Sequence, residues 1–203
     1  LEASIARGTP RQFVNVTVID SGGPEALPPH VAALIAAGTP WDDPRILGGF
    51  RRVLDAIVPE MIPRGVYMLG VANEPGGFFE DEPRSAASFP AFVAAAVEHV
   101  RTIDPRLAVT VVFAGPEDPS IPALMPLTDV AVFNQYAYDL VPDGSCTLGG
   151  VDLPIPRATG PRSIGGMLDA LVEAAGGRLV CIQEFGQSTG WDDRARTLGP
   201  LAG

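Results

Sequence analysis

The chain has 203 residues, of which 46% are apolar and 19% are charged. This length suits one globular domain with a real core, and the apolar share excludes a disordered chain. No apolar run approaches the ~20 residues of a transmembrane helix, so we expect no membrane partner. The formal charge is −10, from 24 acidic and 14 basic side chains without a basic block. Phosphate binding needs clustered basic residues, so we expect no nucleic-acid partner either.

Five short runs rich in Val and Ile alternate with longer amphipathic segments. Nearly all residues of each run are apolar, which is typical of parallel strands buried on both faces. The predicted strands are 13–19, 66–72, 108–113, 129–133 and 179–182. The predicted helices are 30–37, 46–57, 89–103, a Pro-broken stretch near 120–124, and 164–175. Repeated β-α-β order predicts a parallel sheet, either an open doubly wound sheet or a closed (β/α)8 barrel.

Polar side chains gather at the ends of four predicted strands. In both folds, functional residues lie at the carboxyl ends of the strands. The polar residues there, in chain order, are Asp20, Asn73, Glu74, Asn134, Gln135, Tyr136, Gln183 and Glu184. The sequence therefore predicts a functional site at this edge of the sheet.

Glu74 and Glu184 are the strongest candidate pair. A carboxylate at the end of an apolar strand is costly to bury unless it is paired, hydrogen-bonded or exposed in a cleft. Two facing carboxylates can supply a proton donor and a nucleophile, which is the equipment for cleaving a glycosidic bond. The structural alternative is that each Glu caps the helix that follows it.

Two segments carry a resemblance to a known family. Residues 67–75, YMLGVANEP, resemble the fourth strand of clan A glycoside hydrolases, which ends in Asn-Glu. Residues 179–186, LVCIQEFG, resemble the seventh strand of the same clan, which ends in a nucleophilic Glu. The sixth strand of the family often carries His-x-Tyr, and here Tyr136 matches while Asn134 stands in the place of His. The chain is thus similar to the cellulase-like family 5 type of this clan.

The resemblance implies a TIM (β/α)8-type barrel and a retaining β-glycosidase. Glu74 would be the general acid/base, Glu184 the nucleophile, Asn73 a ligand of the sugar 2-hydroxyl, and Tyr136 the residue that orients Glu184. Further candidates for substrate contacts are Asn134, whose role the resemblance leaves open, Asp20, and Trp191, with Trp41 a weaker candidate for stacking on a sugar ring. We expect an oligo- or polysaccharide substrate, no cofactor or metal, and a secreted or extracellular protein, although the sequence contains no signal peptide.

Two questions stay open, and one further motif has a simpler interpretation. A non-catalytic carbohydrate-binding or interaction protein on the same barrel would have the same strands. Asp20-Ser21-Gly22-Gly23-Pro24 resembles the nucleophile signature of trypsin-like proteases, but only 20 residues precede Ser21, none of them His, so we interpret it as a turn. Cys146 and Cys181 either pair or remain separate thiols.

The length sharpens the fold prediction. A complete (β/α)8 barrel usually takes about 250 residues. The five predicted strands correspond to the third to seventh strands of the family. We therefore expect an incomplete barrel, one glycosidase-like catalytic domain over residues 1–203 that is truncated at both ends, with its first and last strands unpaired at their outer edges.

Overall fold

The computed structural model describes residues 12–20, 23, 26–136, 142–148, 151–156 and 163–186. Within them, five parallel strands form one sheet in the order β1-β2-β3-β4-β7. These strands are β1 (Gln12–Asn15), β2 (Val66–Asn73), β3 (Ala108–Phe113), β4 (Ala131–Tyr136) and β7 (Val180–Gly186). Each predicted strand has a counterpart in the sheet, but the first is shorter than the predicted 13–19, because β1 ends at Asn15 and residues 16–19 lie outside any strand.

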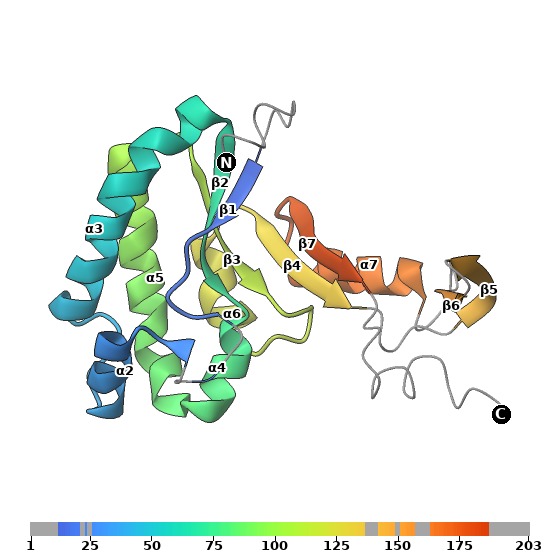
Figure 1. Cartoon of the computed structure of the whole chain (residues 1–203), viewed down its shortest axis with the longest axis horizontal. Coiled ribbons are helices and arrows are strands. Elements are labelled where there is room, and N and C mark those ends of the chain that lie inside the picture. Colours follow the sequence, from blue (N-terminus) through green and yellow to red (C-terminus); the bar gives the residue numbers. More distant parts are fainter. Residues whose placement is uncertain are drawn as a thin grey trace.

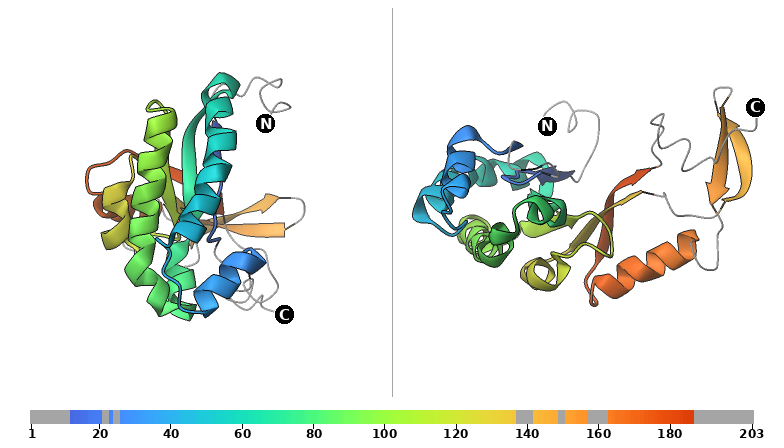
Figure 2. Two further views of the ribbon diagram at one scale, coloured as in Figure 1. Left: turned by 90° about the vertical axis from the view of Figure 1, so that its left-hand side faces the viewer. Right: turned by 90° about the horizontal axis from the view of Figure 1, so that it is seen from below.

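The helices follow one another around the outside of the curled sheet (Figures 1 and 2). They are α2 (Pro29–Ala36), α3 (Pro44–Met61), α4 (Pro75–Asp81), α5 (Pro83–Ile103), α6 (Ile121–Leu124) and α7 (Ile164–Ala174), with 3-10 turns η2 (Ile62–Arg64) and η3 (Met125–Leu127). Among the described residues, no helix is both long and apolar enough to pass through a bilayer. The architecture is a half-barrel, an incomplete TIM-type barrel as the sequence predicted.

Two elements were missing from the sequence-based prediction. The short helix α4 has no counterpart among the predicted helices, and α5 begins at Pro83 instead of residue 89. An antiparallel hairpin of β5 (Pro142–Leu148) and β6 (Val151–Pro156) stands apart from the main sheet (Figure 1). The Gly149-Gly150 dipeptide between its strands is a typical hairpin signal that the prediction overlooked.

Helix α3 shows how these segments acquire their structure. Asp43 precedes it and accepts a hydrogen bond from the backbone N–H of Arg45 at 2.9 Å, while Pro44 occupies the first turn. Its buried residues recur at helical spacing on one face: Ile46, Phe50, Leu54, Val58 and Met61. This face packs against α5 and the sheet, so burial of the apolar stripe stabilises both layers.

An aromatic cluster fills the space between α3, α4 and α5. The indole of Trp41 is fully buried and makes edge contacts with Phe78, Phe89 and Phe92, with ring centroids 5.1 to 5.9 Å apart. The expectation that Trp41 could stack on a sugar ring is therefore wrong. A large aromatic side chain between apolar segments gains more free energy from burial than from display in a loop.

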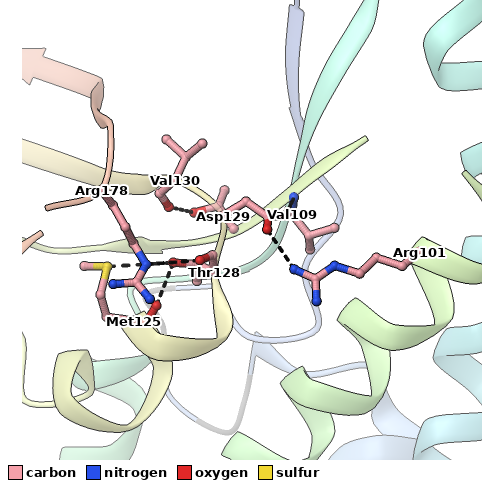
Figure 3. A network of polar contacts seen from close by, with 8 residues as sticks. Arg101, Val109, Met125, Thr128, Asp129, Val130 and Arg178 are labelled. Carbon is pink, nitrogen blue, oxygen red and sulfur yellow. Dashed lines mark hydrogen bonds and ion pairs between the residues drawn. The ribbon is translucent and has the colours of Figure 1, made fainter. Parts of the chain in front are cut away.

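Polar contacts brace the sheet at the end opposite the strand-end Glu residues (Figure 3). The carboxylate of Asp129, just before β4, accepts hydrogen bonds from the backbone N–H of Val109 at 2.9 Å and from Arg101 of α5 at 2.7 Å. The guanidinium of Arg178 donates to the carbonyl of Thr128 at 3.1 Å. Asp129 was expected to begin a strand, but its side chain instead joins β3, β4 and α5.

Candidate active site

The backbone of Glu74 is strained. Its φ of 47° and ψ of 50° place it in the left-handed region, and it is the only described residue other than glycine with positive φ. Backbone hydrogen bonds tie this segment to the two chain segments beside it. Asn73 N–H donates to the Ile19 carbonyl at 3.0 Å, and Glu74 N–H donates to the Val112 carbonyl at 2.8 Å. Such strain persists only where the surroundings fix it, and it concentrates at functional sites.

The side chain of Glu74 does not cap helix α4. Glu74 occupies the N-cap position, but it makes no side-chain capping bond. Its Oε1 instead accepts a hydrogen bond of 2.8 Å from Nδ2 of Asn134 on β4. The carboxylate therefore turns toward the other strand ends, as a catalytic group would require.

A short polar network connects three of the predicted site residues to Glu74. Asn134, only 1% exposed, also approaches Oδ1 of Asn73 with Nδ2 at 3.4 Å. The amide Nδ2 of Asn73 donates to Oδ1 of Asp20 at 2.8 Å. Because a primary amide has two N–H groups, Asn73 keeps one for another acceptor. Asp20, Asn73, Glu74 and Asn134 thus form one cluster at the carboxyl ends of the strands.

Glu184 lies in β7 beside this cluster. In the parallel register, Asn134 of β4 is paired with Glu184 of β7. The side chain of Asn134 therefore bonds one candidate carboxylate while its backbone neighbours the other. The sequence had suggested that Asn134 and Glu184 follow the ends of their strands. In the structure β4 continues to Tyr136 and β7 to Gly186, so both residues lie within the last residues of the strands.

An irregular register comes just before each candidate Glu, at the end of β2 ahead of Glu74 and within β7 ahead of Glu184. Strand β2 advances from Gly70 to Asn73 while β3 advances only from Thr110 to Val112. Strand β7 advances from Ile182 to Glu184 while β4 moves by a single residue. Such bulges change the face to which following side chains point and recur near active sites. The apolar pattern of the sequence contains no sign of them.

The loop after β3 supports the segment that follows Glu74. The buried carboxylate of Asp118 accepts hydrogen bonds from the N–H of Ala114, and from the N–H and hydroxyl of Ser120, at 2.6 to 3.0 Å. Asp118 packs so closely on Gly76 that a methyl group there would overlap its Oδ1 and lie 2.8 Å from its Cγ. Sequence reasoning missed this contact, because neither residue belongs to a recognisable motif.

Several predicted residues lie partly or wholly outside the described part of the chain. Trp191 and Ser21 are among the residues that are not described, and for Tyr136 and Cys146 only the backbone is. Cys181 is a free, partly buried thiol, and burial raises its pKa. Within the described ranges, no group of His, Cys, Asp and Glu side chains is arranged to hold a metal ion.

Among known proteins, a solved structure of a GH53 catalytic domain supports the fold. No family model matches the chain, and no curated protein matches its sequence. Two solved structures of glycoside hydrolases are similar to it. The catalytic domain of a GH53 protein from Ignisphaera aggregans matches 94% of the chain with a TM-score of 0.52 and 17% identity. The GH2 β-galacturonidase from Eisenbergiella tayi bound to galacturonate matches 89%, with a TM-score of 0.49 and 12% identity. The chain spans 65% of the first protein and 26% of the second.

Proposed function

We propose that the chain carries the catalytic centre of a retaining glycoside hydrolase that cleaves β-linked glycans, of the clan A type that its motifs resemble. The observation that carries the proposal is the position of Asn134. Its side chain donates to Glu74 Oε1, and its backbone is in register with Glu184. Double displacement needs two carboxylates, and in retaining enzymes in general these are about 5 Å apart. Glu74 and Glu184, at one edge of a curled parallel sheet, are the groups that could supply them.

In this mechanism the two carboxylates have different tasks. Glu74 protonates the glycosidic oxygen while Glu184 attacks the anomeric carbon, forming a glycosyl ester and releasing the first product. Glu74, now ionised, then removes a proton from a water molecule that attacks the anomeric carbon and frees Glu184. The hydrogen bond from Asn134 to Oε1 orients the Glu74 carboxyl group, and we assign the proton that Glu74 donates to Oε2. The negative net charge suits a neutral oligo- or polysaccharide, and we propose a secreted or extracellular location.

The test is hydrolysis of a panel of β-linked polysaccharides and p-nitrophenyl β-glycosides by the full chain. We expect Glu184→Ala to abolish turnover and Glu74→Ala to lower kcat by roughly 10²- to 10⁴-fold. External azide should restore part of the activity of Glu74→Ala, and NMR of the first product should show retained anomeric configuration. Glu98→Ala, an exposed substitution in the middle of α5, is the matched control and should keep full activity.

Two outcomes would contradict the proposal. Full activity of Glu184→Ala would exclude it as the nucleophile, and inverted product configuration would exclude double displacement. Glycan binding without turnover by the unsubstituted chain would favour the non-catalytic carbohydrate-binding alternative.

A further inference from the structure

A hydrogen bond between two side-chain amides joins the two edge strands of the sheet. Nδ2 of Asn15, on β1, donates to Oε1 of Gln183, on β7, at 3.1 Å across 168 positions of sequence. Strands β1 and β7 stand at opposite ends of the strand order, with β2, β3 and β4 between them. Neighbouring strands are about 4.8 Å apart, so the edges of a flat five-stranded sheet would be roughly 19 Å apart. The bond therefore spans the hollow side of a strongly curled sheet.

The structure makes room for this contact on β2. Gly70 is in register with Asn15, and a methyl group at Gly70 would overlap Asn15 Oδ1 and lie 3.0 Å from its Cγ. Any larger residue at position 70 would displace the Asn15 amide from its path toward β7. Gly70 lies within β2, four residues before Glu74, which follows the end of that strand, so the contact lies deeper in the sheet than the candidate carboxylates.

At its other end the contact reaches the position next to Glu184. Gln183 immediately precedes Glu184 and falls within the irregular step of β7 between Ile182 and Glu184. A strand is least constrained by its ladder where its register shifts, so side-chain contacts there set the direction of the following residue. We propose that Asn15 and Gln183 are positioning residues that hold Glu184 opposite Glu74. This inference rests on the proposed function of the two carboxylates.

The energetics separate positioning from stability. Asn15 Oδ1 is buried and makes no hydrogen bond. The cost of burying this unsatisfied acceptor offsets the stability that the hydrogen bond to Gln183 contributes. Replacing both partners of a hydrogen bond by apolar groups of the same shape is close to neutral for stability. Removing only one partner leaves the other group unsatisfied and destabilises the fold. The Asn15–Gln183 pair therefore contributes more to the position of neighbouring residues than to the free energy of folding.

The experiment compares Asn15→Leu, Gln183→Met and the double variant, which replace each amide by an apolar side chain of similar shape. We expect each single variant to unfold at lower temperature and the double variant to regain most of the loss. Turnover behaves differently: kcat per folded molecule should fall by about 10- to 100-fold in all three, with KM changed much less, because small misplacement of a reacting group is costly. Gln12→Met is the control, since Gln12 lies on β1 with a buried Nε2 that makes no hydrogen bond. It should leave kcat unchanged.

The outcomes distinguish this inference from the proposed function. Wild-type kcat in the double variant would overturn the positioning role while leaving the glycosidase proposal standing. A wild-type chain without turnover of any β-linked glycan would overturn both. If the single variants do not fold, hydrogen exchange of the Asn15 side-chain amide in the unsubstituted chain decides: exchange as fast as that of an exposed amide would also overturn the proposal.

Discussion

The left-handed backbone of Glu74 leads to a prediction that does not depend on any activity. Glu74→Ala and Glu74→Gly both remove the carboxylate and its bond to Asn134, so their difference isolates the backbone. At φ 47° and ψ 50° a residue with Cβ is strained by about 1–2 kcal/mol, whereas glycine is not. Glycine also loses more chain entropy on folding than alanine, about 0.5–1 kcal/mol. The glycine variant should therefore be the more stable of the two by about 1 kcal/mol.

Local relaxation cannot easily remove this strain. The N–H groups of Asn73 and Glu74 are bonded to the carbonyls of Ile19 and Val112, and Pro75 follows with a fixed φ. A difference of 1 kcal/mol corresponds to about 2–4 °C in Tm for a chain of this size. Thermal and urea unfolding of the two variants measure it directly.

In the control, at Glu98, the alanine variant should be more stable than the glycine variant. Glu98 is exposed in the middle of α5, where alanine is favoured over glycine by about 1 kcal/mol. Glu98→Ala should therefore be more stable than Glu98→Gly by the same margin. If Glu74→Ala equals or exceeds Glu74→Gly in stability while the Glu98 pair behaves as expected, the left-handed assignment at Glu74 is wrong.

Two further predictions concern the surroundings of the site and the acid limb of stability. Gly76→Ala should destabilise the fold by about 1–3 kcal/mol, because the added methyl group would overlap Asp118. Gly77 is exposed in the same helix, so Gly77→Ala is the control and should be neutral or stabilising. Equal unfolding midpoints of the two variants would contradict the close contact. The Arg106 side chain and N–H lower the pKa of Asp104 from 3.8 to about 2, so the stability this carboxylate contributes is present above pH 4 and is lost as pH falls toward 2. Asp104→Asn should flatten the pH dependence of the unfolding free energy over that interval; an unchanged slope would refute the assignment.

The strands of the main sheet were predictable because burial on both faces leaves a continuous run of β-branched residues, whereas the hairpin of β5 and β6 was missed. Strand β3, Ala108–Phe113, is such a run, and its last five residues are all buried. The convergence of Asp20, Asn73, Glu74 and Asn134 was also predictable, since parallel strands bring their carboxyl ends to one edge. Helix α4 was not, because Pro75-Gly76-Gly77 is typical of a turn and the helix depends on burial of Phe78 for its stability.

The finer geometry of the site depends on contacts that no local pattern encodes. The register shifts before Asn73 and Glu184 arise from how neighbouring strands pair. The bond from Asn134 to Glu74 joins β4 to β2 past the intervening β3, and that from Asn15 to Gln183 joins the two edges. Both bonds exist only because the sheet is curled.

Curvature is therefore the property that turns four strand ends into one site. In a flat sheet, the ends of β2 and β7 would be three strand spacings apart, or about 14 Å, too far for two carboxylates to act on one bond. The amide contacts on the hollow side bridge strands that the curvature brings close, and each contact includes a residue of β4 or β7 next to the register shift. If the proposed function holds, a change that flattens the sheet should thus lower turnover before it affects the apolar core on the opposite, helix-covered face.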